Sequence, residues 1–205
     1  MRAAERDRPD VQAERIAWPE ITGEIPVRNL VFIDESAAST SMTRLYGRSP
    51  VGERVADSTP LSGWHSFTML SAVRWDGPFA PLLLDGALDG ESFAAWVEQM
   101  LIPELRPGDV VVMDNLPTHR VGAVSRLLEK SEHRLLYLPP YSPDLNPIEE
   151  MWSKVKSVLR SLKARTWDEL LSAMAIALKT IARSDSSGYF RHCGYRISQS
   201  GFAER

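Results

Sequence analysis

The stretch LVFIDES, Leu30–Ser36, joins four apolar residues to two carboxylates. A continuous run of β-forming apolar residues is typical of a strand that is covered on both faces of a sheet. We therefore expect a central strand that ends at Asp34. The stretch DVVVMDN, residues 109–115, repeats the pattern, with Asp114 after four apolar residues. If the two strands are neighbours, both carboxylates emerge at the same edge of one sheet.

The segments around these strands predict the rest of the fold. We expect strands over 65–75, 79–88 and 134–140, and helices over 91–105 and 118–130, from Pro147 onward and over 167–182. Three strands before any helix, followed by alternation, indicate an α/β fold with a mixed sheet and helices on both faces. This order resembles the ribonuclease H-like arrangement.

Composition and length are those of a soluble globular chain with one domain. The 205 residues are 43% apolar and 25% charged, and no apolar run approaches the roughly 18 residues of a membrane span. The N-terminal residues have no signal-peptide pattern, and a single cysteine, Cys193, suits a reducing cytoplasm. We expect a lead-in over 1–24, a main domain over 25–185 and a tail over 186–205.

The charge distribution is uneven. The net charge of −3 argues against a uniformly basic nucleic-acid binder. Residues 151–205 carry ten basic and four acidic residues, 10 − 4 = +6, which leaves −9 for residues 1–150. The basic third is either a phosphate-contacting face beside a metal-binding face or a set of solvated helix faces.

A third carboxylate follows the proline-rich stretch YSPDLNPIEEMW, Tyr141–Trp152. Asn146 is expected as the N-cap of a helix that begins at Pro147. The rigid loop fixes the start of the helix, so its first turn brings a carboxylate back to the rim. On a helical wheel Glu149 borders the apolar stripe, whereas Glu150 points toward solvent, so Glu149 is the better candidate. The ordinary alternative is that both acids complement the helix dipole.

Three carboxylates at one rim, Asp34, Asp114 and Glu149, predict a metal site. They would repel one another and raise their pKa values unless a cation neutralised them. Hard oxygen ligands in incomplete number suit Mg²⁺ or Mn²⁺, which keep open positions for phosphate oxygens. We expect two ions, because a pair roughly 3.5–4 Å apart promotes phosphodiester displacement.

The same residues carry a family resemblance. FIDES, VVMDNLPTHR and LPPYSPDLNPIEEMW resemble the three catalytic blocks of DDE transposases of the mariner-like superfamily, particularly the bacterial insertion-sequence branch. The spacing agrees, since 149 − 114 − 1 = 34 residues separate the second and third acids. The segments MTRLYGRSPVGER and YFRHCGY are similar to that branch as well. The resemblance implies hydrolysis of a phosphodiester at a transposon end, then attack of the freed 3′-hydroxyl on target DNA, commonly at a TA dinucleotide.

Further residues are expected to support the site or to contact DNA. Asn115, His119 and Asn146 are candidates for supporting the carboxylates, although His119 is equally explained as a helix-surface residue. The candidates for contact with the DNA backbone are Arg44, Arg48, Arg54, Lys154 and Lys156. For the three arginines the alternative is a mobile solvated loop. The tryptophans Trp64, Trp75, Trp96 and Trp152 are expected in the core, and a metal site at His192 and Cys193 is not favoured.

The sequence departs from the family at its N-terminal side. Such transposases carry a helix-turn-helix region there, whereas about 25 polar residues precede the first catalytic strand here. We expect a catalytic portion alone, from a frameshifted or decayed element, whose partners are DNA, a second copy of the chain on DNA and an upstream helix-turn-helix product, in a bacterial cytoplasm at the nucleoid. The main alternative is a non-catalytic DNA-binding or dimerisation fragment. A third alternative is a nuclease that acts on RNA in RNA–DNA hybrids. It follows from the fold alone and is not favoured, because nothing in the sequence reads a 2′-hydroxyl.

Overall fold

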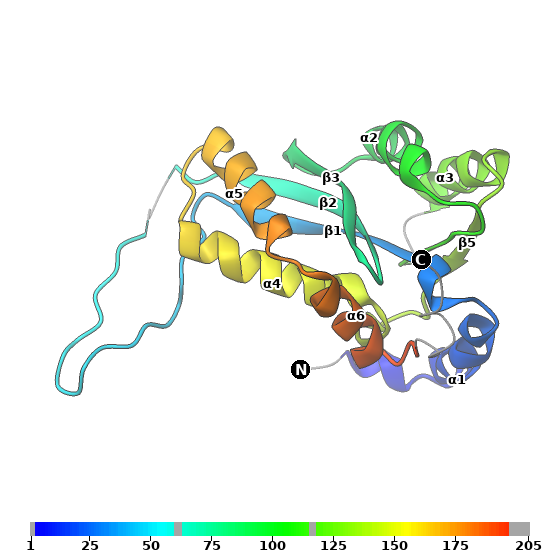
Figure 1. The fold of residues 1–205 in the computed structure, drawn as a ribbon, viewed down its shortest axis with the longest axis horizontal. Helices are drawn as coiled ribbons and strands as arrows, with labels where there is room; N and C mark the ends of the chain where they lie inside the picture. Colours follow the sequence, from blue (N-terminus) through cyan, green and yellow to red (C-terminus); the bar gives the residue numbers. More distant parts are fainter. Residues whose placement is uncertain (1–2, 60–62, 115–117, 197–205) are drawn as a thin grey trace.

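The structure is a computed structural model that describes residues 3–59, 63–114 and 118–196, without the side chains of 118–121. One five-stranded sheet and six α-helices make up the described fold (Figure 1). The strands are β1 (Leu30–Ser39), β2 (Ser66–Arg74), β3 (Gly77–Asp85), β4 (Val110–Met113) and β5 (Arg134–Tyr137). The helices are α1 (Pro9–Gly23), α2 (Gly90–Trp96), α3 (Thr118–Lys130), α4 (Pro147–Leu162), α5 (Trp167–Lys179) and α6 (Arg183–His192). Short 3₁₀ and π turns extend or join these helices.

The sheet is mixed, as predicted, with strand order β3-β2-β1-β4-β5. β1, β2 and β3 form an antiparallel meander, whereas β4 and β5 run parallel to β1. The two strands that precede Asp34 and Asp114 are therefore neighbours. β1 pairs with β4 only over Leu30–Phe32, while its pairing with β2 continues to Ser39.

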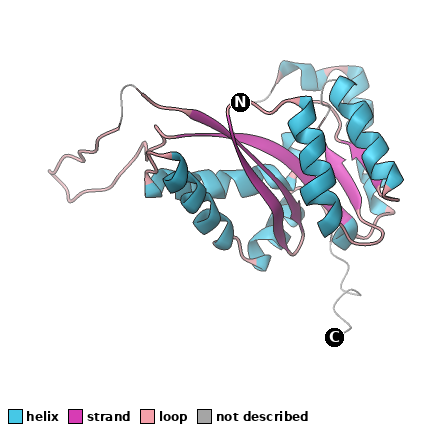
Figure 2. Cartoon of the chain, turned by 90° about the horizontal axis from the view of Figure 1, so that it is seen from above, coloured by secondary structure: helices cyan, strands magenta, loops and turns pink. Residues whose placement is uncertain are grey.

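Helices cover both faces of the sheet, which separates the core into two layers (Figure 2). On one face α4, α5, α6 and α1 pack on side chains that include Leu30 and Phe32 of β1. On the other face α2 and α3 pack on Val31 and Ile33. Alternate residues of β1 thus point to opposite layers, as the two-residue period of a strand requires. No helix within the described ranges has both the length and the apolar character needed to cross a bilayer.

Two segments that we expected outside the main domain are packed on it. Residues 9–23 form α1, where Trp18 is 4% exposed and belongs to the core on the α4 side. α6 continues across the expected boundary at residue 185 and buries Phe190, whose ring lies 5.4 Å from that of Phe32. α1 lacks a strong sequence signal because only Val11, Trp18 and Thr22 of its fifteen residues are buried.

The loop between β1 and β2 extends away from the body of the molecule over residues 43–59 (Figure 1). Its apolar side chains Leu45, Tyr46 and Val51 are at least 80% exposed. Trp64, near its end, is 53% exposed, so its prediction as a core residue is wrong. The reason is that Trp64 lies in the loop before β2, which begins at Ser66, and is therefore outside the sheet. Of the other tryptophans, Trp96 and Trp152 are buried and Trp75 packs at the core edge.

Candidate active site

The strand register places Asp34 and Asp114 level with each other. β1 and β4 pair with a constant offset, 110 − 30 = 80, through Phe32 and Val112. Continuing this offset by two residues sets Asp34 opposite Asp114. The prediction that Asp34 ends its strand is wrong, because β1 continues to Ser39 alongside β2. Asp34 instead lies where β1 loses its partner on the β4 side, which still exposes its carboxylate at a rim.

Both aspartates lie on the α4 face of the sheet. Leu30, Phe32, Val110 and Val112 belong to the core layer that contains α4. Because strand side chains alternate, the next even-numbered positions, 34 and 114, belong to the same face. Glu149 lies in the first turn of α4, on that side of the sheet. Three distant parts of the sequence therefore lie near one corner of the sheet, close enough for Asp114 and Glu149 to raise the pKa of Asp34.

Asn146 joins the helix start to the sheet. It is 3% exposed, and its side-chain Nδ2 donates a hydrogen bond of 3.1 Å to Oδ2 of Asp34. Asn146 is the N-cap residue of α4, as predicted, but it caps the helix only through its backbone oxygen, which accepts from the N–H of Glu149 at 3.1 Å. The side-chain amide of Asn146 instead bonds Asp34 on the neighbouring sheet. Its Oδ1 is buried and has no hydrogen-bond partner in the described structure.

Electrostatics at this corner oppose ionisation. Burial raises the pKa of Asp34 most, and repulsion from Glu149, Asp114 and Glu35 adds to the rise, so that the pKa lies at about 8. One hydrogen bond acts in the opposite direction, from the backbone N–H of Glu35 to Oδ1 of Asp34 at 2.8 Å. Asp114 reaches water at the rim, yet partial desolvation by the surrounding protein also raises its pKa. Carboxylates that repel in this way are stabilised by a nearby cation.

The donor set fits a hard divalent cation. The corner offers carboxylate oxygens from Asp34, Asp114 and Glu149, and the unpartnered Oδ1 of buried Asn146 adds a polar atom in need of a partner. Asp114 and Glu149 are close enough to Asp34 to raise its pKa, but the three carboxylates do not converge on one point. In the part of the chain that the structure describes, no three His, Cys, Asp or Glu residues form a ready metal cluster.

The remaining predicted residues fall into different surroundings. Asn115 and the side chain of His119 lie outside the described residues. The three arginines of the loop between β1 and β2, Arg44, Arg48 and Arg54, are exposed. From Asp34, β1 runs five more residues to Ser39, so the loop starts about 17 Å from the carboxylates.

The two lysines of α4 that we predicted to contact DNA differ in their contacts. Lys154 donates to Oδ2 of Asp185 at 2.7 Å and to the backbone oxygen of Thr180 at 3.0 Å, which ties α4 to the start of α6. Lys156 is half-buried on the same helix. A contact of Lys154 with phosphate would therefore compete with an existing ion pair.

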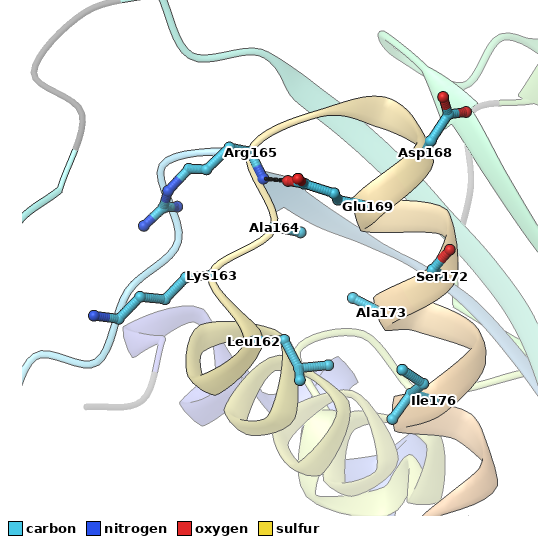
Figure 3. Close-up of a pocket in the computed structure, with 9 residues that line it drawn as sticks. All are labelled: Leu162, Lys163, Ala164, Arg165, Asp168, Glu169, Ser172, Ala173 and Ile176. Atoms are coloured by element: carbon cyan, nitrogen blue, oxygen red, sulfur yellow. Dashed lines mark hydrogen bonds between the residues drawn. The ribbon is translucent and has the colours of Figure 1, made fainter.

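A groove of about 560 Å³ opens at the far end of α4 (Figure 3). Leu162, Ala173 and Ile176 form its apolar wall, and the backbone N–H of Arg165 donates to Glu169 beside it at 2.7 Å. Glu149 and Leu162 are thirteen residues apart on one helix, hence about 20 Å. The groove is therefore separate from the carboxylate corner.

Sequence reasoning missed the residues that hold the loop before α4. Arg15 of α1 donates to Ser142 and Asp144, and Tyr195 donates to the backbone oxygen of Leu145. Ser142 and Asp144 belong to the proline-rich stretch YSPDLNPIEEMW, so the sequence did point to the segment that contains them. Tyr195 ends the stretch YFRHCGY, which the family resemblance had singled out, whereas Arg15 had no such signal.

The fold and the site together define a class: a ribonuclease H-like α/β domain with acidic residues gathered at the rim of its central strands. The chain belongs to the DDE superfamily endonucleases, because the model of that family matches residues 29–171. This range contains Asp34, Asp114 and Glu149. The broader family placement that we expected is thereby confirmed.

Similar proteins support this placement. The chain is 35% identical over 72 residues to the Tcb1 transposable element transposase of Caenorhabditis briggsae, covering 35% of the chain and 26% of that protein. It is 32% identical over 104 residues to the Tc1 transposase of Caenorhabditis elegans, covering 48% of the chain and 37% of that protein. The chain thus spans about a quarter to a third of the curated relatives it matches.

A solved structure confirms the fold. The mariner Mos1 paired end complex with Mn superposes with a TM-score of 0.71 at 14% identity, covering 96% of this chain and 62% of that one. At this identity the likeness concerns architecture, which is the mixed sheet with helices on both faces that the sequence predicted.

Proposed function

We propose that this chain is a transposase catalytic domain that cleaves DNA phosphodiester bonds and transfers DNA strands with the help of Mg²⁺ or Mn²⁺. The observation that carries the proposal is that Asp34, Asp114 and Glu149 lie near one corner, where the two aspartates share register and face. Membership in the DDE superfamily endonucleases and the relatives named as transposases support it.

Each residue of the corner has a defined role in this proposal. Asp34, Asp114 and Glu149 hold the cations, two in number, and Asn146 fixes the orientation of Asp34 through its 3.1 Å hydrogen bond. The bound metal supplies charge neutralisation and Lewis-acid polarisation of phosphate oxygens. The protein positions the scissile phosphodiester for water first and for the freed 3′-hydroxyl second, without a covalent enzyme intermediate.

DNA is the partner that this chemistry requires. The exposed Arg44, Arg48 and Arg54 lie in the loop that begins about 17 Å from the carboxylates, so a duplex bound at the carboxylates and extending toward this loop would meet basic side chains. The solved neighbour is a paired end complex. A homodimer on DNA and an upstream helix-turn-helix product complete the proposed assembly.

The finer placement is also a proposal. The segments MTRLYGRSPVGER and YFRHCGY support the bacterial insertion-sequence branch and hence a bacterial cytoplasm at the nucleoid. The relatives named above come from nematodes, so they support the superfamily rather than this branch.

The test is nicking of supercoiled DNA by the full 205-residue chain with Mg²⁺ or Mn²⁺. Asp34→Ala, Asp114→Ala and Glu149→Ala should each lower the rate by more than the roughly 10–100-fold expected for residues that merely support metal ligands. Glu150→Ala is the matched control, because Glu150 neighbours Glu149 but faces His192 of α6, at 3.6 Å. A folded Glu149→Ala variant that nicks at the wild-type rate would remove Glu149 from the mechanism.

A second candidate is a non-catalytic DNA-binding or dimerisation fragment. One observation favours it: within the described residues the three carboxylates do not form a ready metal cluster. Folded wild-type protein that binds DNA but neither binds Mn²⁺ nor nicks would support this candidate over the first.

A further inference from the structure

The loop that leads into α4 is held by α1. Arg15 donates from Nη1 to the hydroxyl of Ser142 at 2.5 Å, and from Nη1 and Nη2 to the two carboxylate oxygens of Asp144 at 3.1 and 2.8 Å. A guanidinium that contacts both oxygens of a carboxylate fixes direction as well as distance. The Arg15 side chain is 16% exposed and that of Asp144 is 44% exposed, so this contact is only partly shielded from water.

A second contact holds the next residue of the loop. The hydroxyl of Tyr195 donates to the backbone oxygen of Leu145 at 2.7 Å and accepts from Nε1 of Trp18 at 2.9 Å. Trp18 and Tyr195 are 4% and 5% exposed, so these bonds are buried. α1 therefore reaches the loop directly through Arg15 and indirectly through Trp18.

The residue that follows these contacts is Asn146, which bonds Asp34. Only three residues separate Ser142 from Asn146, and Pro143 and Pro147 restrict the backbone on both sides. A displacement at Ser142 and Asp144 is therefore passed to Asn146 rather than absorbed. A hydrogen bond near 3 Å weakens steeply with small changes of distance and angle, so the Asn146 amide reports on the loop.

We propose that Arg15 is a positioning residue of the active site, although it contacts none of the carboxylates. Through Ser142 and Asp144 it sets the place of Asn146 and of the first turn of α4, and thereby the geometry in which the carboxylates meet a divalent cation. The part that concerns the cation rests on the proposed function. The part that concerns the Asn146 amide rests on the contacts alone.

Arg15→Gln in the full chain tests the inference, with Arg8→Gln as the matched control. Arg8 also belongs to a bidentate pair near α1, with Asp10 at 3.1 and 2.5 Å, but that pair is exposed and, among the described contacts, makes no hydrogen bond to Ser142 or Asp144. The first measurement is the side-chain amide signal of Asn146 in a ¹⁵N–¹H NMR spectrum. The second is the Mn²⁺ dissociation constant by electron paramagnetic resonance, and thermal unfolding shows that each variant is folded.

Arg15→Gln should move the Asn146 amide signal and weaken Mn²⁺ binding about tenfold, the lower end for residues that support metal ligands. Arg8→Gln should change neither. An unmoved Asn146 signal in folded Arg15→Gln overturns the inference. If Arg15→Gln does not fold, Arg15→Lys, which keeps the charge but loses the bidentate contact, is judged by the same signal. Wild-type protein that fails to bind Mn²⁺ would count against the proposed function, while the amide signal still decides the role of Arg15.

Discussion

The raised pKa of Asp34 predicts that the metal-free chain loses stability as the pH rises. Its pKa is about 8 in the folded protein, against about 3.9 in an unfolded chain. Between these values the folded state holds a proton that the unfolded state has released. The free energy of unfolding therefore falls with increasing pH, and the loss is complete only above the folded pKa. Asp34→Asn removes this dependence.

The magnitude follows from the width of the window. From pH 5 to pH 8 a single fully linked proton changes the free energy of unfolding by at most about 4 kcal/mol, at about 1.4 kcal/mol per pH unit. Asp34 is half-buried at a rim, so water and salt screen the repulsion. Halving the ceiling gives an expected difference of about 2 kcal/mol between the wild type and Asp34→Asn over this range.

Urea denaturation in EDTA-containing buffers at pH 5, 6, 7 and 8 measures this difference. Asparagine at position 34 weakens the bond from the Glu35 backbone N–H, which costs about 1 kcal/mol at every pH and leaves the slope unchanged. Groups remote from position 34 are the same in both proteins, so the difference in slope reports on Asp34 and on the carboxylates that repel it. Curves that run parallel for the two proteins would refute the reasoning. Added Mg²⁺ should stabilise the wild type more at pH 8 than at pH 5, because it competes with the proton.

Three other substitutions test the packing and the DNA surface. Arg74→Ala leaves Asp109, 2% exposed, without its ion-pair partner at 2.8 Å, so urea denaturation should show a loss of about 3–5 kcal/mol; a loss under 1 kcal/mol would contradict this. Trp18→Phe removes the donor to Tyr195 and should cost about 1–2 kcal/mol in the same assay, whereas unchanged stability would argue against a structural role for this bond. Arg48→Ala should lower the slope of log DNA affinity against log salt by about 0.9 and leave Mn²⁺ affinity unchanged; an unaltered slope would exclude Arg48 as a phosphate contact.

The sequence predicted the sheet for physical reasons that the structure bears out, and the same pattern pointed to Asp34 and Asp114. LVFIDES and VVVMD are continuous apolar runs because β1 and β4 are covered on both faces, and a run of that kind fixes both the strand and its carboxylate. Strand length was harder to predict. β1 continues past Asp34 because β2 pairs with it, and that long-range partner has no counterpart in the local pattern.

Side-chain contacts between remote segments account for what the sequence could not predict. Asn146 stands at a helix start, where local propensity favours an N-cap, yet its amide bonds Asp34, 112 residues away. α1 buries three residues of fifteen, too few for a stripe, and its attachment depends on Arg15 and Trp18 meeting partners more than 120 residues later. Such pairs need the folded arrangement before they can be recognised.

In the proposed site, two carboxylates are positioned by the sheet and the third by a loop. Asp34 is held by the pairing of β1 with β2, in which a shift of β1 by one residue would turn its side chain to the other face, and Asp114 directly follows β4. Glu149 depends on a short loop that Arg15 and Tyr195 hold from outside the sheet. The repulsion that raises the pKa of Asp34 is a cost of bringing these acids together. The loop contacts oppose that cost. Changes in α1 should therefore alter the affinity for a cation more than they alter the sheet.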